Sequence, residues 1–237
     1  MNRKYLVMSL DDGVTQDERV ISVFRRYGLT ATFNLNAGRL GEREEIPVPA
    51  YDGKLLRHDK VTKNQVLNGL YDGFEVACHG YTHAYLPSVS EKAAEEEIEK
   101  DYEELTRLTG RSPLGIAYAG MTPNYTDGVI AFLKKGGKLK YGRTIDETHG
   151  FTFPSDFYRW DPTCQFRGDE LIGRAEEFFR LTPRGEDALF FVWGHSYEFD
   201  LGTECWDKLG YFCKEVSGRK DIECLTCGEF YGRFHKE

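Results

Sequence analysis

The spacing of apolar residues along this chain changes repeatedly between continuous short runs and helical spacing. This pattern predicts strands and helices in alternation. Short apolar runs, typical of buried strands, occur at residues 5–10, 30–36, 74–78, 115–119, 139–143, 188–193 and 221–225. Apolar residues at helical spacing lie between several of these runs, at 126–135, 168–182 and 203–217. This alternation predicts an α/β fold with a parallel sheet, and about seven strands suffice for a closed or nearly closed (β/α) barrel.

The first two helices of this pattern have recognisable ends. Thr15 and Glu18 have the spacing of a capping box, and the helix that follows is expected to stop at Gly28. A long amphipathic helix is expected from Ser90 until Gly110, with its glutamates on a solvated face. Residues 37–60 are rich in Gly and Pro, so we expect an irregular excursion there.

This excursion is a candidate wall for a cleft. It includes Tyr51-Asp52-Gly53, a sequence that favours the turn of a small hairpin. No internal repeat or linker interrupts the pattern on either side of it. We therefore expect one domain over residues 1–237, long enough to bury a full core.

Charge and hydropathy exclude some partners. The formal net charge is −8 and the two signs are mixed along the chain, which argues against nucleic acid as a partner. No apolar stretch approaches the roughly 20 residues of a membrane span, and the first residues lead into a strand without a signal-peptide pattern. We expect a cytoplasmic protein without a membrane partner; the oligomeric state, a homo-oligomer included, stays open.

Two adjacent carboxylates, Asp11 and Asp12, follow the first apolar run directly and precede Gly13. Neighbouring carboxylates at a strand end repel each other and lose hydration, so they stay ionised only if a cation compensates them. The alternative is a simple turn and helix cap. The position after a strand favours a site, because parallel α/β folds build their sites at the carboxyl ends of strands.

A second group of polar residues follows the run at 74–78. His79 and His83 are four residues apart and could converge on one ion if the segment formed a helical turn. Asp12 would complete a three-ligand face with an open position, which fits Zn²⁺ best, although another divalent transition metal is an alternative. Water in that position would have a pKa of about 7, and Asp11 would serve as its base. A histidine pair of this spacing can also be incidental.

These residues resemble motifs of the polysaccharide deacetylase family, also called NodB-like or carbohydrate esterase family 4. Ser9-Leu-Asp-Asp-Gly13 is similar to the family's Thr-Phe-Asp-Asp-Gly, and Ala31-Thr32-Phe33 follows as in the family. His79-Gly-Tyr-Thr-His83 resembles the family's His-Ser/Thr-x-x-His, with Gly80 in place of Ser or Thr. The resemblance spans roughly residues 5 to 230 and implies an irregular (β/α)7 barrel, the NodB-like deacetylase fold.

Later motifs agree in part. Trp193-Gly194-His195 is similar to a late family motif, which implies that His195 is the general acid. The family's third motif has an arginine that orients the catalytic aspartate, but Ala117 occupies its place here, and Arg143 is our candidate replacement. Three residues are further candidates for substrate binding: Tyr118, Gly120 with its backbone N–H, and Trp160 as a wall of the cleft.

The expected activity is hydrolysis of the acetyl group of an N-acetylated sugar, a related carbohydrate or another small amide, with metal-activated water. Asp12, His79 and His83 would hold the metal, Asp11 would be the base and His195 the acid. Two alternatives remain. The same barrel could open a cyclic imide or ureide, as allantoinases do, or cleave an O-acetyl ester, and the chain could be a non-catalytic carbohydrate-binding relative.

Overall fold

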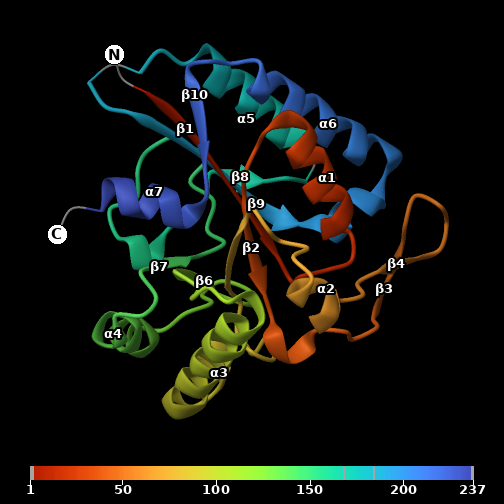
Figure 1. The fold of residues 1–237 in the computed structure, drawn as a ribbon. Coiled ribbons are helices and arrows are strands. Elements are labelled where there is room, and N and C mark those ends of the chain that lie inside the picture. Colours follow the sequence, from red (N-terminus) through yellow and green to blue (C-terminus); the bar gives the residue numbers. More distant parts are fainter. Residues whose placement is uncertain (1–2, 168, 184, 236–237) are drawn as a thin grey trace.

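A curled sheet of parallel strands forms the centre of the protein in this computed structural model, which describes residues 3–167, 169–183 and 185–235 (Figure 1). Its strands follow in the spatial order β7, β6, β5, β2, β1, β9 and β8, and β10 pairs with β1. Their bounds are β1 (Lys4–Asp11), β2 (Thr32–Leu35), β5 (Glu75–Cys78), β6 (Gly115–Ala117), β7 (Tyr141–Arg143), β8 (Cys164–Gln165), β9 (Ala188–His195) and β10 (Ile222–Leu225). The predicted parallel α/β fold is confirmed.

Helices pack around this sheet, most of them on its outer face. They are α1 (Asp17–Tyr27), α2 (Lys63–Leu67), α3 (Glu91–Thr109), α4 (Asp127–Gly136), α5 (Asp169–Arg180), α6 (Thr203–Ser217) and α7 (Cys227–Phe234). In Figure 1, α5 and α6 lie at the top of the view and α3 and α4 at the bottom, at opposite ends of the curled sheet. The predicted helices at 126–135 and 203–217 are confirmed; residue 168, where a third was expected to begin, lies outside the described residues.

Side chains of β1 alternate between two apolar cores. Leu6, Met8 and Leu10 point to the larger core, between the sheet and the outer helices, and are at most 1% exposed. Tyr5 and Val7 point to the other side, into a second core that includes Phe230 of α7. This alternation continues to Ser9 and Asp11, so Asp11 lies on the inner side of the curled sheet, above the second core.

The two edges of the sheet are linked by the segment around Trp160. Trp160 forms an isolated parallel bridge with Arg143 at the end of β7, and β8, four residues later, pairs with β9. The curl therefore comes close to closing into a barrel, as expected for this fold class.

Helix ends agree with the sequence at both ends of α3 and at the end of α1, where Gly28 is left-handed, and differ only at the start of α1. Ser90 caps α3 through its side chain, and Gly110 ends it in the left-handed conformation. The capping box predicted at Thr15 is wrong, because α1 begins at Asp17 and its capping residue, Gln16, makes no side-chain cap bond. The hydroxyl of Thr15 bonds instead to the side chain of Gln16.

The predicted hairpin in the 37–60 excursion is confirmed. It consists of β3 (Glu45–Pro49) and β4 (Leu55–Arg57), which are antiparallel. The residues after β4 return to the sheet, since the N–H of Val61 donates to the carbonyl of Gly13 and the N–H of Thr15 to that of Asp59. None of the helices in the described part of the chain is long and apolar enough to cross a membrane.

Candidate active site

The carboxyl ends of the strands bring the predicted polar residues together. In register, Asp11 of β1 lies beside Asn34 of β2 and His195 of β9. Asp12 follows with a φ of 81°, a left-handed conformation that turns the chain sharply at the end of the strand. Asp11 and Asp12 are 2% and 4% exposed, so two carboxylates are buried next to each other.

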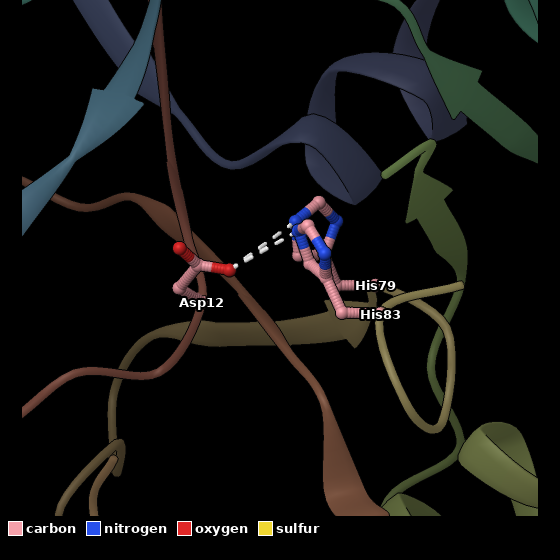
Figure 2. A group of neighbouring side chains, drawn as sticks. All are labelled: Asp12, His79 and His83. Atoms are coloured by element: carbon pink, nitrogen blue, oxygen red, sulfur yellow. Dashed lines mark ion pairs between the residues drawn. The ribbon is translucent and has the colours of Figure 1, made fainter. Parts of the chain in front are cut away.

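Asp12, His79 and His83 converge in the manner expected of metal ligands. Figure 2 shows both imidazoles facing one carboxylate oxygen, Asp12 Oδ1, which is 3.4 Å from His83 Nε2 and 3.7 Å from His79 Nε2. Asp12 Oδ1 is buried and has no hydrogen-bond partner. His79 Nδ1 lies 2.8 Å from the carbonyl of Ala117 and donates to it, which leaves Nε2 with a free lone pair. One oxygen and two nitrogens in this arrangement fit Zn²⁺ or a similar divalent cation.

The two histidines converge through an irregular loop. The expected helical turn is wrong, because Gly80 and His83 have φ values of 80° and 64° and the segment is not helical. Helix α3 holds this loop: Glu97 accepts from the N–H of Thr82 at 2.8 Å and from its hydroxyl at 2.9 Å. Burial lowers the pKa of His83 to about 4, with the neighbouring His79 adding to the effect, so His83 is neutral and able to bind a metal at neutral pH.

Asp12 is surrounded by cationic and histidine side chains from the excursion. His58 Nε2 lies 2.8 Å from Asp12 Oδ2, and Lys60 Nζ lies 3.5 Å from Asp12 Oδ1. Burial by itself would raise the pKa of Asp12, but the hydrogen bond from His58 and the charge of Lys60 outweigh it and hold this pKa well below its usual value. Sequence reasoning gave His58 no role and did not consider Lys60, because neither belongs to a motif.

Asp11 is held from two sides. Asn34 Nδ2 donates to Asp11 Oδ1 at 2.8 Å, and Arg143 Nη2 donates to Asp11 Oδ2. Burial opposes ionisation of Asp11, yet the charge of Arg143 prevails and lowers the pKa. The structure thus places Arg143 beside Asp11, where the sequence argument needed a cation. Because Arg143 is fully buried, it is not itself a surface for substrate.

His195 ends β9 on the same edge of the sheet. Its Nε2 is 4.0 Å from Asp12 Oδ2, and its Nδ1 is 3.5 Å from Glu198 Oε2. Burial would lower the pKa of His195, but Glu198 and the two aspartates raise it to about 9. The imidazole is therefore protonated at neutral pH and able to donate a proton.

Two residues predicted to bind substrate do not line the site. Trp160 is 1% exposed and packs in the inner core against Phe191 and Phe230. Tyr118 is also 1% exposed, and its hydroxyl donates to the carbonyl of Tyr158. Both predictions are wrong, because the segments after β6 and β7 turn these rings inward. Gly120 is exposed, with a φ of 88°, in the loop after β6.

Comparisons with known proteins agree with this architecture. Residues 1–137 match the polysaccharide deacetylase family, whereas no curated protein matches the chain. Among solved structures, the Xyl-CE4 domain of a multidomain xylanase from the hindgut metagenome of Trinervitermes trinervoides has a TM-score of 0.59 at 15% identity, covering 98% of this chain and 91% of that one. The family 4 carbohydrate esterase from Streptomyces lividans, in complex with acetate, has a TM-score of 0.60 at 13% identity, covering 94% and 93%.

Puue allantoinase is also similar, with a TM-score of 0.67 at 10% identity, covering 100% of this chain and 93% of that one. At such identities these three structures show a shared fold and nothing about substrate. The family match is the stronger finding, since it covers more than half of the 237 residues and includes Asp11, Asp12, His79 and His83. This chain belongs to the polysaccharide deacetylase family.

Proposed function

We propose that this protein is a metal-dependent hydrolase that removes acetyl groups from an N-acetylated sugar or a related carbohydrate. One observation carries the proposal: a buried carboxylate oxygen without a hydrogen-bond partner, Asp12 Oδ1, faces the free Nε2 atoms of His79 and His83. A second carboxylate, Asp11, lies beside it in its ionised form. A hydrolase needs both a metal site and a base, and here they are adjacent.

Asp12, His79 and His83 are the residues that would hold the metal. A divalent cation such as Zn²⁺ would supply Lewis acidity toward the acetyl carbonyl and lower the pKa of water. Protein side chains would carry out the proton transfers. Asp11, kept ionised by Arg143, accepts a proton from the water that adds to the carbonyl carbon.

His195 completes the reaction on the other side. Its protonated imidazole donates a proton to the sugar nitrogen as the carbon–nitrogen bond breaks, so acetate and an amine leave. The backbone N–H of the exposed loop at Gly120 is our candidate donor to the oxyanion. Each proton that the reaction moves thus has a donor or an acceptor among the described residues.

Ring opening of a cyclic imide or ureide is the second candidate. It is supported by a fold that overlaps Puue allantoinase along the whole chain, and it needs the same metal and base. Cleavage of an O-acetyl ester depends less on a proton donor, since an alkoxide is a better leaving group than an amide nitrogen. The protonated state of His195 therefore favours a nitrogen leaving group.

The test is metal content and product release for the wild type and Asp11→Asn, with N-acetylated sugars, O-acetyl esters and cyclic imides as substrates. We expect acetate from N-acetylated sugars, and a loss of about 10²- to 10⁴-fold in Asp11→Asn with the metal retained. Asp52→Asn, at an exposed residue of the hairpin turn that pairs with Lys54, is the matched control. Stoichiometric metal without acetate from any substrate would refute the deacetylase assignment, and product from an imide would establish the alternative.

A further inference from the structure

We propose that His58, with Glu44 behind it, is a positioning residue that aims Asp12 at the metal. The inference rests on the metal-binding part of the proposed function. It adds to the site two residues that belong to no sequence motif. These residues come from the excursion at 37–60, in which the sequence predicted a hairpin and a wall of a cleft. The two residues that flank the hairpin, Glu44 before β3 and His58 after β4, would thus be part of the metal centre.

The two oxygens of Asp12 have different surroundings. Asp12 Oδ2 accepts a hydrogen bond of 2.8 Å from His58 Nε2, whereas Oδ1 has none and faces the two histidines. A carboxylate can rotate about its last bond, which would exchange or displace its oxygens. The bond from His58 fixes one oxygen and so directs the other toward His79 and His83.

Glu44 orients His58 in turn. His58 Nδ1 lies 2.8 Å from Glu44 Oε2, and the same oxygen accepts from Arg39 Nη2 at 2.9 Å. The backbone agrees with this pairing, since the N–H of His58 donates to the carbonyl of Glu44 at 2.8 Å. Both ring nitrogens of His58 therefore have fixed partners, which sets the plane of the ring.

The backbone around His58 is pinned to the loop that includes Asp12. Val14 and Lys60 form an antiparallel bridge, and the N–H of Lys60 donates to the carbonyl of Glu42. His58 is 8% exposed and Lys60 is 1% exposed, so water does not compete for these contacts. Lys60 Nζ lies 3.1 Å from His58 Nε2 and 3.5 Å from Asp12 Oδ1, so it contacts both the histidine and the carboxylate. The contact between His58 and Asp12 is thus built into the fold.

The experiment compares Zn²⁺ affinity, by competition with a chelator, in the wild type, His58→Leu and His58→Gln. We expect His58→Leu to bind about 10- to 100-fold more weakly, as is usual when a partner of a metal ligand is lost. Gln can still donate to Asp12 Oδ2, so we expect an affinity within about threefold of the wild type. His235→Leu, at an exposed histidine that belongs to neither candidate metal-binding group of the described residues, is the matched control.

Unchanged affinity in His58→Leu would overturn the proposal, as would a glutamine variant as weak as the leucine variant. Glu44→Ala tests the same chain of contacts at a more exposed position. We expect its Zn²⁺ affinity to be several-fold weaker than that of the wild type. Should His58→Leu fail to fold, unchanged affinity in Glu44→Ala would overturn the proposal by itself.

Acetate release by the wild type separates this inference from the proposed function. Zinc binding that depends on His58, without acetate from any substrate, would support the positioning role while the deacetylase assignment fails. Acetate release together with equal zinc affinity in the wild type and His58→Leu would leave the function standing and overturn the positioning role.

Discussion

Asp11 and Asp12 are buried side by side, and each has a cation of its own. Arg143 contacts Asp11, and Lys60 lies 3.5 Å from Asp12. Two neighbouring carboxylates in a low-dielectric site would otherwise raise each other's pKa. Here each carboxylate has a compensating cation, and the pKa of each is lowered although burial opposes ionisation.

Removal of Arg143 is the sharpest test of this arrangement. Arg143→Met leaves a buried, uncompensated Asp11, so we expect the free energy of unfolding at pH 7 to fall by about 3–5 kcal/mol. Folding lowers the pKa of Asp11 from 3.8. The contribution of ionised Asp11 to the free energy of unfolding is therefore present above pH 3.8 and is lost as the pH falls through the pKa of the folded state. Urea unfolding should therefore show the largest difference between variant and wild type at neutral pH and a smaller one in acid.

Arg159→Met is the control for this prediction. Arg159 pairs with Asp127 and Asp156, partly exposed to water, so we expect a change below about 1 kcal/mol. A cost for Arg143→Met as small as this, or one that does not depend on pH, would contradict the proposed pairing with Asp11.

Asp17, at the start of α1, predicts the opposite pH dependence. It is fully buried, its Oδ2 accepts from the hydroxyl of Tyr71 at 2.6 Å, and burial raises its pKa to about 7. Because the pKa is raised, the contribution of protonated Asp17 to the free energy of unfolding is fully present below about pH 4 and is lost as the pH rises through about 7. Between these values the free energy of unfolding falls by about 1.4 kcal/mol for each pH unit. Asp17→Asn cannot ionise, so we expect it to gain stability relative to the wild type between about pH 5 and pH 8.

Urea unfolding of both proteins at several pH values in this range measures the gain. The asparagine carbonyl can still accept from Tyr71, which keeps the comparison close to a removal of charge alone. Parallel pH profiles for the two proteins would show that Asp17 does not titrate in this range.

Among the elements, the loop after β5 depends on helix α3. Loop residues His79 and His83 have no helical hydrogen bonds to fix their spacing. Instead, Glu97 of α3 holds the loop by accepting two hydrogen bonds from Thr82. Asp101, one helical turn further along α3, accepts from the backbone N–H of His79 at 2.8 Å. Two carboxylates of one helix thus hold both ends of the histidine loop.

Glu97→Ala should therefore loosen the loop without unfolding α3. We expect zinc affinity to fall by about tenfold, because His83 loses its support while the helix gains a good helix former. Glu96→Ala is the matched control, since Glu96 lies on the same helix and forms ion pairs with the exposed Lys92 and Lys100. Competition with a chelator measures both variants, and equal losses in the two would contradict the role of Glu97.

For the whole molecule, a metal would join segments that are far apart in the chain. Asp12 follows β1 and His83 lies in the loop after β5, so an ion bound to both stabilises the folded state against the unfolded chain. We expect Zn²⁺ at about 1,000 times its Kd to add about 4 kcal/mol, and a chelator to remove this gain. Thermal unfolding with and without zinc measures it.

Asp12→Asn should abolish this stabilisation. Glu147, His149 and Glu170 form a second, more exposed group that could bind a metal, so Glu147→Gln is the control. Stabilisation that survives in Asp12→Asn and disappears in Glu147→Gln would place the metal at the second group.

Much of the fold was predictable from local patterns, because strands that are buried on both faces and helices with one apolar face differ in their periods. The ends of α3, the hairpin at 51–53 and the strands of the large sheet other than β8 follow from residues close together in sequence. The same holds for the three metal-ligand candidates, since Asp12 and the histidine pair each follow an apolar run directly. Trp160 and Tyr118 failed because burial of a ring depends on which way a distant segment turns.

By itself, the sequence determined the element order, the parallel sheet and the edge at which the polar residues gather, since the carboxyl ends of parallel strands meet at one edge. Only the tertiary structure decided which groups compensate the two aspartates. Arg143 is 132 residues from Asp11 and His58 is 46 from Asp12. Electrostatic compensation acts through space at a few ångströms, so the fold, and not the spacing along the chain, selects the partner of a buried charge.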